Sequence, residues 1–492
     1  MRSQTLTTLQ ESIEAALLLA QTSCQTAQWT AVIDNCESAI TQCKQALELE
    51  QPATTPSAKP STSELIPNAA QSDSEQTVAQ LHLAKGDLLE KQGDLAEAIA
   101  FYQRAIALAP TSAEIQDALS SAYLARAMQL QRSGDTVAAT QQYLQAITQF
   151  PHLFTAYSRL RYNLLRYDIP RADPLLQDVV QTCQAILAKH PQLRPARITL
   201  SYALTRLNRT NEAIVSYRSI TGSSQSASRH APDVIIIGAE KSGTTSLHQY
   251  LRSHPQFIPP AEKEIDFFDL EYCCGLDWYL AHFPPASAQT PPPQTNLPWI
   301  SGETSANYLY SDVAPTRIFE HFPKIKLAVI LRDPVDRTVS RYNMMVRNGA
   351  EKRSFSVAIA EEIDAIQKAT KGDEIDWKTL NRCRHVGNSL YYCHLKRWLS
   401  LFPQEQFVIL QSEDLFKQPQ QTMERFYALL NIATDSSQQQ YPQHNAGNYQ
   451  PANTEVRQHL AQFFAPHNRK LEALLDRSFS WTSFKAFTQT AL

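Results

Sequence analysis

Residues 233–251 restrict the fold of this chain more than any other segment does. They read DVIIIGAEKSGTTSLHQYL, an unbroken run of β-branched residues that leads through a short loop into a helical pattern. Such a run predicts a strand buried on both faces of a parallel sheet. The loop after it aims backbone N–H groups and a helix N-terminus at one point, which favours a phosphate ligand. The candidate binding residues are Gly238, Lys241, Ser242, Gly243, Thr244 and Thr245.

This loop differs from the phosphate loop of ATPases and kinases in the place of its Lys. In that motif a Lys and then a Ser or Thr directly follow the last Gly. Here Thr244 follows Gly243, and Lys241 comes two positions before that Gly. The spacing disfavours an ordinary ATPase or kinase, although a small-molecule kinase stays an alternative.

A second junction between a strand and a helix carries an Arg and a Ser. Residues 327–342, LAVILRDPVDRTVSRY, predict a strand that ends at Arg332 and a helix in which Ser340 follows eight residues later. A guanidinium binds phosphate oxygens as a planar fork, and a hydroxyl further along the helix adds one more donor. We expect Arg337 and Arg341, on either side of Ser340, to be solvent-exposed charges of the helix.

Short apolar runs and helical patterns alternate through the C-terminal half of the chain. Because the runs are continuous rather than alternating, they predict strands of a parallel sheet. The sequence therefore predicts an α/β three-layer domain with a central parallel sheet at residues 231–492. The expected strands are residues 234–237, 299–301, 327–331 and 407–410, and the expected helices include residues 245–253, 336–346 and 420–430.

Residues 81–110 have the spacing of a tetratricopeptide repeat (TPR). Small residues such as Ala98 and Ala105 let two antiparallel helices approach, Tyr102 lies between them, and Pro110 ends the second helix. The pattern recurs after 41 residues rather than 34, so the first helix of the second unit should be about two turns longer. We expect a TPR-like helical array at residues 76–220.

The segments around this array complete the expected domain organisation. Residues 1–51 form a further helical segment and a candidate TPR-like unit, and the Pro-, Ser- and Thr-rich residues 52–75 form a linker. A second linker covers residues 221–230. Stacked helix pairs offer a concave surface, which allows a protein partner or self-association through the repeats.

Composition excludes several classes of function. Lys and Arg number 45 against 48 Asp and Glu, for a net charge of -3, so nothing indicates nucleic-acid binding. No apolar run is long enough to span a membrane. The 8 Cys and 13 His residues occur without paired metal-ligand spacing, so we expect no metal, reduced thiols and a cytoplasmic protein.

The motifs around Lys241 and Arg332 together resemble those of the sulfotransferases that use 3′-phosphoadenosine 5′-phosphosulfate (PAPS). The 5′-phosphosulfate loop of that family has the form GxxKxGTT, as here from Gly238 to Thr245. The resemblance implies that Arg332 and Ser340 hold the 3′-phosphate of the donor. It also implies that Lys241 stabilises the negative charge that develops on the leaving phosphate.

Three further segments resemble the heparan sulfate N- and 3-O-sulfotransferases. Residues 299–318, WISGETSANYLYSDVAPTRI, imply that Glu303 is the general base. Residues 260–272, PAEKEIDFFDLEY, imply an acceptor cleft with Lys263, Glu264 and Asp266 as substrate-binding candidates. Near the C-terminus, Asn445 and Tyr449 lie in a segment like the donor-covering loop of the family.

The function expected from these observations is sulfonyl transfer from PAPS to a hydroxyl or amine, with a carbohydrate or polysaccharide as the acceptor. The carbohydrate part follows from the resemblance only. Two alternatives remain open. One is a TPR interaction protein whose second domain binds a nucleotide without catalysis, and the other is the small-molecule kinase.

Overall fold

The computed structural model of the chain describes residues 69–166, 173–221, 228–288, 298–372, 374–433, 440–442 and 454–483, together with Ser38 and Thr41. Contacts within the chain divide it into two units, Met1–Thr199 and Leu200–Leu492. The expected helical segment at residues 1–51 lies outside the described residues, apart from Ser38 and Thr41. Residues 69–75 of the expected linker belong to the first described helix instead.

Within the described residues of the first unit, the first two helix pairs have the packing expected of TPR repeats. In α3 (Ala69–Gln92) and α4 (Leu95–Leu108), the ring of Tyr102 is fully buried. A Cβ at Gly86 would lie 2.4 Å from Cε1 of Tyr102, so only Gly allows the two helices to approach this closely. In the second pair, α5 (Ala113–Ser133) has 21 residues and α6 (Thr136–Gln149) has 14. Because α3 has 24 residues, the expectation of a longer first helix in the second unit was wrong.

Four more helices extend the helical series along the chain. They are α7 (Phe154–Arg166), α8 (Pro174–Lys189), α9 (Arg194–Arg206) and α10 (Thr210–Ile220). The boundary between the two units falls inside α9, after Thr199. The C-terminal part of α9 and the whole of α10 therefore group with the second unit, although the sequence had suggested a repeat domain that continues to residue 220.

A four-stranded parallel sheet is the centre of the second unit, in the order β2-β1-β3-β6. Its strands are β1 (Val234–Gly238), β2 (Gly302–Thr304), β3 (Lys326–Leu331) and β6 (Phe407–Gln411). All five residues of β1 are buried, as expected of a strand covered on both faces. The predicted α/β architecture with a central parallel sheet is confirmed.

One strand lies further along the chain than its apolar run suggested. The sequence favoured residues 299–301, but the paired strand is β2 at Gly302–Thr304, in register with Val234–Ile236 of β1. A Cβ at Gly302 would lie 2.2 Å from the carbonyl oxygen of Val234, so the close pairing requires Gly at this position. Ile300 makes only an isolated bridge with Phe257.

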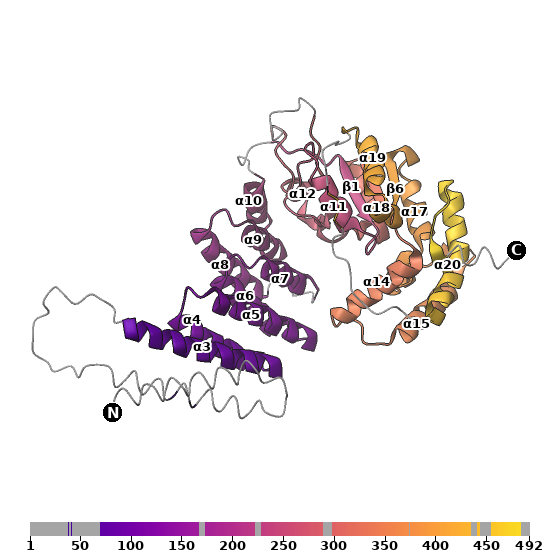
Figure 1. Cartoon of the computed structure of the whole chain (residues 1–492). Helices are drawn as coiled ribbons and strands as arrows, with labels where there is room; N and C mark the ends of the chain where they lie inside the picture. Colours follow the sequence, from indigo (N-terminus) through magenta and orange to yellow (C-terminus); the bar gives the residue numbers. More distant parts are fainter. Residues whose placement is uncertain are drawn as a thin grey trace, which may run out of the picture. The chain divides into compact units, whose positions relative to one another are not determined.

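Helices pack against the sheet, and further helices form a second apolar cluster. One apolar cluster joins β1, β3 and β6 to α11 (Thr244–Arg252), α18 (Ser412–Lys417) and α19 (Pro419–Leu430). A second cluster joins α14 (Pro334–Arg347), α15 (Phe355–Ala369) and α20 (Thr454–Leu475), and α20 lies beside α14 and α15 in Figure 1. The remaining helices are α12 (Leu276–Leu280), α13 (Ala314–His321), α16 (Trp377–Arg382) and α17 (Tyr391–Leu399).

None of the helices in the described part of the chain combines the length and the apolar character needed to cross a membrane.

Candidate functional site

The loops that carry the candidate residues leave the sheet at one edge. Since β1, β2 and β3 run parallel, their carboxyl-terminal residues Gly238, Thr304 and Leu331 all lie at that edge. The loop at residues 239–243 follows β1, and Arg332 follows β3. In open α/β sheets ligands bind outside the carboxyl ends of the strands, which makes this edge the expected site.

The loop at residues 239–243 has the backbone of an anion site. Gly243 has φ of 101°, a conformation that strains any residue with a side chain. A Cβ there would also lie 3.2 Å from Cζ of Phe416. Gly243 offers no side-chain cap to the nine-residue helix α11, and the positive end of a helix favours an anionic ligand.

Two cations of the predicted site meet at this loop. Nη1 of Arg332 donates to the carbonyl oxygen of Lys241 at 3.2 Å. Burial lowers the pKa of Lys241, and the charges of Arg347 and Arg332 lower it further, whereas Glu240 raises it. Positive charges this close together repel one another. A bound phosphate or sulfate group would offset that repulsion.

The helix α14 faces the same loop through its buried side. Asp333 caps the helix by accepting from the N–H of Val335 at 3.0 Å. Ser340 is 7% exposed, and the neighbouring Arg341 forms an ion pair with Glu240 of the loop. Ser340 is thus buried beside a residue that contacts the loop, and its role at the 3′-phosphate stays a prediction.

The expectation that Arg337 and Arg341 are solvent-exposed charges was wrong. Arg337 is fully buried and Arg341 is 6% exposed. Nε of Arg337 donates to Oγ of Ser389 at 2.5 Å, and its Nη2 donates to the carbonyl oxygens of Arg384 and His385. A buried guanidinium with this many acceptors holds the segment 384–389 against α14.

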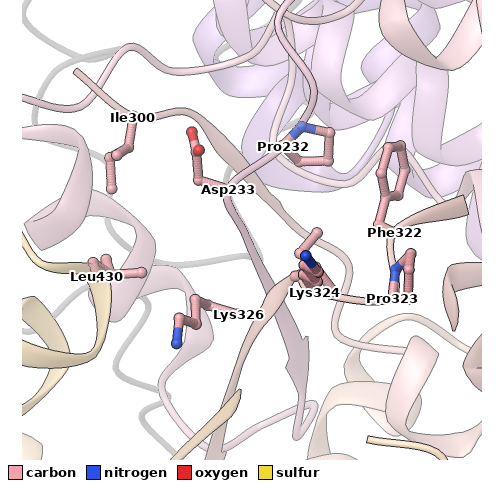
Figure 2. A pocket seen from close by; sticks show the side chains of 9 residues that line it. Pro232, Asp233, Ile300, Phe322, Pro323, Lys324, Lys326 and Leu430 are labelled. Carbon is pink, nitrogen blue, oxygen red and sulfur yellow. The ribbon is translucent and has the colours of Figure 1, made fainter. Parts of the chain in front are cut away.

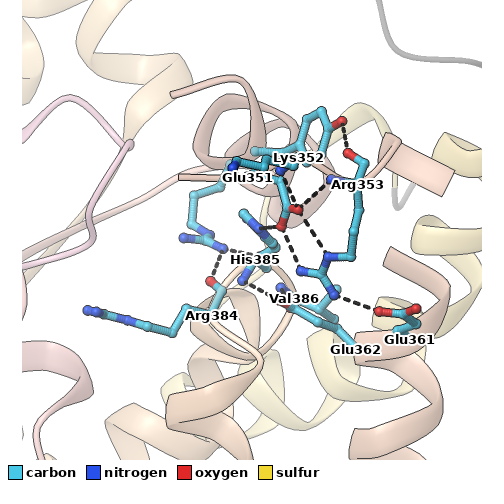
Figure 3. Close-up of polar contacts among 10 residues, drawn as sticks. Glu351, Lys352, Arg353, Glu361, Glu362, Arg384, His385 and Val386 are labelled. Carbon is cyan, nitrogen blue, oxygen red and sulfur yellow. Dashed lines mark hydrogen bonds and ion pairs between the residues drawn. The ribbon is translucent and has the colours of Figure 1, made fainter. Parts of the chain in front are cut away.

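Polar contacts from α15 hold the same segment from its other side (Figure 3). Oε2 of Glu362 accepts from the N–H of Val386 at 2.7 Å. Nε2 of His385 lies 3.1 Å from Oε2 of Glu351, and Arg353 pairs with both Glu351 and Glu361 at 2.6 Å. Burial and the charge of Arg341 lower the pKa of Arg384 in this segment, and the charge of Glu240 opposes them.

The expected acceptor segment lies against the N-terminal turn of α11. Nζ of Lys263 donates to Oγ1 of Thr245 at 3.4 Å and pairs with Oε1 of Glu264 at 2.6 Å. The carbonyl oxygen of Lys263 accepts from the N–H of Thr304, which ties the segment to the end of β2. The side chain of Glu264 is 48% exposed, so this carboxylate is accessible at the site.

Glu303, the residue predicted to be the general base, has a different environment. It is 1% exposed. The Tyr279 hydroxyl donates to its Oε1 at 3.0 Å and the Ser305 hydroxyl to its Oε2 at 3.3 Å. Burial raises the pKa of Glu303 to about 8, although the hydrogen bonds of Tyr279, Tyr308 and Ser305 lower it. Burial thus favours the neutral form of this carboxyl group and closes it to an acceptor, so the geometry does not favour Glu303 as the base.

Two further carboxyl groups lie close to Glu303. Burial and the charges of Asp269 and Glu264 hold the pKa of Asp266 well above its usual value. Burial also raises the pKa of Asp269 to about 7, against the opposing charges of Arg384 and Arg317. Glu264, Asp266, Asp269 and Glu303 therefore form one acidic cluster beside the cationic loop.

Most of the residues selected from the sequence are brought together, and a few were missed. The motif spacing identified the loop, Arg332, Ser340 and the acceptor segment. It did not select Asp269, although this residue lies within the quoted segment 260–272. Tyr279 and Arg384 were also missed, because they lie outside the quoted motifs. Asn445 and Tyr449 lie outside the described residues.

A cavity of about 430 Å³ opens at the opposite edge of the sheet (Figure 2). Its lining includes Asp233 before β1, Ile300 before β2, and Lys324 and Lys326 at the start of β3. These are the amino-terminal ends of the strands, whereas Lys241 and Arg332 follow the carboxyl ends. The cavity is therefore not part of the candidate site.

One group of possible metal ligands occurs within the described residues. Side-chain atoms of Glu271, Cys273 and Cys274 lie within 4.8 Å of one another. The carboxylate of Glu271 already accepts from Sγ of Cys274 at 3.7 Å and lies 3.9 Å from Nη1 of Arg206. Three ligand atoms with these competing contacts fall short of a tetrahedral site.

Comparison with known families matches both parts of the chain. Residues 231–464 match the family model described as sulfotransferase domain. Residues 79–112 match the model of the tetratricopeptide repeat. These ranges include the loop at residues 239–243, Arg332 and Ser340 in the first case, and the helix pair α3 and α4 in the second.

Curated proteins are similar to about half of this chain. The membrane-associated sulfotransferase kil1 of Dictyostelium discoideum is 27% identical over 51% of this chain and 66% of its own length. The bifunctional heparan sulfate N-deacetylase/N-sulfotransferase 2 of Homo sapiens is 30% identical over 50% of this chain and 30% of its own length. The heparan sulfate glucosamine 3-O-sulfotransferase 5 of Mus musculus is 29% identical over 51% of this chain and 74% of its own length.

The chain thus spans less than two thirds of the length of kil1 and about a third of that of the bifunctional relative. Among solved structures, a sulfotransferase from Alicyclobacillus acidocaldarius is 27% identical. The match covers 51% of this chain and 98% of that one, with a TM-score of 0.41.

Proposed function

Residues 231–464 of this chain are a sulfotransferase domain, and from that premise we propose that the protein transfers a sulfonyl group from PAPS to a hydroxyl or amine of a carbohydrate. One observation carries the proposal. Arg332 and Lys263, from separate parts of the chain, both contact the segment that runs from Lys241 to Thr245 at the start of α11. Cations around a helix N-terminus bind a phosphate or sulfate group.

The donor would be held at both of its phosphate ends. The backbone of residues 239–243, with the hydroxyls of Thr244 and Thr245, suits the 5′-phosphosulfate, because Gly243 leaves the N-terminus of α11 uncapped. Arg332 suits the 3′-phosphate because its guanidinium lies against the loop, and Ser340 of α14 would add a hydroxyl donor. The 3′-phosphate is the group that distinguishes this donor from ATP.

We assign the general base to Glu264 rather than to Glu303. The Glu264 carboxylate is 48% exposed and is paired with Lys263, which itself contacts Thr245. A base must come within hydrogen-bond distance of the acceptor proton, and Glu264 is open to an acceptor while Glu303 is buried. Glu303 and Tyr279 instead form a buried hydrogen bond that supports the acceptor segment.

The transfer step needs three contributions from the protein. Glu264 takes the proton of the acceptor hydroxyl or amine as the bond from that atom to sulfur forms. The bond from sulfur to the 5′-phosphate oxygen breaks at the same time, and Lys241 stabilises the negative charge left on that oxygen. 3′-Phosphoadenosine 5′-phosphate and the sulfated acceptor are then the products.

A carbohydrate acceptor is supported by the relatives named for heparan sulfate chemistry. The acidic cluster beside the loop agrees with a neutral or amine-bearing sugar, because carboxyl groups accept hydrogen bonds from hydroxyl and amine groups. A protein partner or self-association through the repeats remains part of the proposal, on the basis of the TPR match. The cytoplasmic location stays a prediction.

The first test is calorimetric titration of the full chain with 3′-phosphoadenosine 5′-phosphate and, separately, with ATP and Mg²⁺. We expect micromolar binding of the 3′-phosphorylated nucleotide only, followed by transfer of labelled sulfate from PAPS to a desulfated polysaccharide. Binding of ATP alone would support the small-molecule kinase. If neither nucleotide binds, the TPR interaction protein is the better explanation. If the 3′-phosphorylated nucleotide binds but no sulfonyl group is transferred, the better explanation is a TPR interaction protein whose second domain binds a nucleotide without catalysis.

A further inference from the structure

The helix α10 makes its contacts with the acceptor segment, although it lies before the matched domain at residues 231–464. Tyr217 of this helix is 1% exposed. Its hydroxyl donates to Oε1 of Glu262 at 2.9 Å. Glu262 is followed directly by Lys263, whose Nζ contacts Thr245 at the start of α11, and by Glu264, which pairs with Lys263. Tyr217, which lies outside the sulfotransferase domain, thus holds Glu262, the neighbour of Lys263 and of the proposed base Glu264.

Rings pack around this hydrogen bond. The ring of Tyr217 lies over that of His282 with 3.7 Å between centroids, and it meets Trp278 edge-on at 5.7 Å. The carbonyl oxygen of His282 accepts from the N–H of Ala261 at 2.7 Å. The segments 261–264 and 278–282 are therefore joined to each other and to the same Tyr217.

A second contact joins the end of α9 to the other side of the acidic cluster. Nε1 of Trp278 donates to Oγ1 of the buried Thr205 at 2.9 Å. The next residue, Tyr279, donates to Glu303 at 3.0 Å. Trp278 and Tyr279 on α12 thus link α9 to the residue beneath the acceptor segment, while Tyr217 fixes the segment itself.

From these contacts we infer that α10 is part of the catalytic unit and that Tyr217 is a positioning residue for Glu264, acting through Glu262. The inference deepens the proposed function and rests on it for its catalytic meaning. Glu264 is half exposed, so its orientation depends on the backbone that carries it. A displacement of about 1 Å at a reacting group costs up to 100-fold in rate, which gives a remote hydrogen bond a measurable effect.

The test is Tyr217→Phe in the full chain, which removes one hydroxyl and keeps the ring. We expect kcat for sulfonyl transfer to fall by roughly tenfold or more, as for loss of a hydrogen bond to a charged group, while the Kd for 3′-phosphoadenosine 5′-phosphate stays within twofold. Tyr143→Phe is the matched control, because the hydroxyl of Tyr143 is also buried and donates to Gln131 at 3.1 Å, in the first unit. Its kcat should equal that of the wild type.

A double-mutant cycle separates positioning from a general loss of structure. In a Glu262→Ala background, Tyr217→Phe should have no further effect on kcat, and Glu262→Gln should keep most of the activity because its amide oxygen still accepts. An unchanged kcat for Tyr217→Phe, or an equal loss in both backgrounds, would overturn the inference. If Tyr217→Phe unfolds, the kcat of Glu262→Gln can be compared with that of Glu262→Ala, because only the Gln side chain still accepts the hydrogen bond from Tyr217.

Hydrogen exchange makes the inference independent of activity. Tyr217→Phe should speed the exchange of the amides at residues 261–266 and leave those of α11 unchanged. If the wild-type chain transfers no sulfonyl group, the proposed function fails, yet this measurement still decides whether Tyr217 holds the segment. Unchanged exchange at residues 261–266 would reject the positioning role.

Discussion

The hydroxyl of Tyr279 lies 3.0 Å from Oε1 of Glu303, and both side chains are buried beneath the acceptor segment. Glu303 has one of the most protected carboxyl groups near the site, whereas Glu264 is open to solvent. The two glutamates therefore have different roles. Glu303 supports the structure of the site, and Glu264 is accessible to an acceptor.

Replacing the two glutamates separately tests this division. Glu264→Gln should lower kcat by about 10²-fold to 10⁴-fold, because the proton of the acceptor loses its base, with the affinity for 3′-phosphoadenosine 5′-phosphate unchanged. Glu303→Gln, the matched change, should keep kcat within about tenfold, since a Gln side chain still accepts from Tyr279. Steady-state kinetics at pH 7 provide the comparison, and the reverse order of losses would restore Glu303 as the base.

The raised pKa of Glu303 predicts how stability depends on pH. Its pKa in the folded chain is about 8 against an ordinary value of 4.5, so the folded chain keeps a proton that the unfolded chain releases. This contribution to stability is present below pH 4.5 and is lost as pH rises to about 8. A Gln side chain does not titrate, so Glu303→Gln removes this pH dependence. The free energy of unfolding of the variant minus that of the wild type should therefore be larger at pH 8 than at pH 4.5, by about 2 to 4 kcal/mol. Urea unfolding of both proteins at the two pH values measures this difference, and a pH-independent difference would contradict it.

Arg332 should determine recognition of the 3′-phosphate. Arg332→Ala is expected to weaken binding of 3′-phosphoadenosine 5′-phosphate by about 10-fold to 150-fold, the usual loss for a hydrogen bond to a charged group. The variant should also bind the nucleotide without the 3′-phosphate as well as it binds the phosphorylated form. Arg332→Lys, which keeps the charge without the planar fork, should fall between the two. Calorimetry with both nucleotides is the measurement, and retained discrimination in Arg332→Ala would exclude this 3′-phosphate site.

Burial of Arg337 predicts a large effect on stability. Arg337→Lys should lower the free energy of unfolding by about 2 to 4 kcal/mol, because an ammonium group cannot reach Ser389 and two carbonyl oxygens at once. Arg353→Lys serves as control, since the Arg353 side chain is 42% exposed and its ion pairs should contribute less than about 1 kcal/mol. Chemical unfolding of the two variants tests the contrast, which equal losses would refute.

Local patterns were sufficient to predict the elements that carry the site. The run before Gly238, the loop around Lys241 and the strand before Arg332 each join a strand to a helix within a few residues, so neighbouring residues decide their shape. The repeat helices around Tyr102 follow from helical spacing in the same way. β2 was harder, because its position depends on how closely Gly302 approaches Val234 of another strand.

Burial and accessibility depended on contacts that are distant in the sequence. Arg337 looked like a surface charge from its helix alone, but the carbonyl oxygens that receive it come from residues 384 and 385. For Glu303, the resemblance of residues 299–318 implied the role of general base. Only the folded structure removes the Glu303 carboxyl from solvent. That burial raises its pKa, although the hydrogen bonds from Tyr279 and Ser305 act in the opposite direction.

The amino-acid sequence by itself determined the α/β and repeat architectures and the loop at residues 239–243. These follow from hydrophobic period and from the backbone requirements of Gly within short segments. Only the tertiary structure decided which carboxylate is open to an acceptor, which arginines are buried, and that Tyr217 of α10 holds the acceptor segment. Desolvation and hydrogen bonding between distant segments control those properties, and both arise only when the chain is folded.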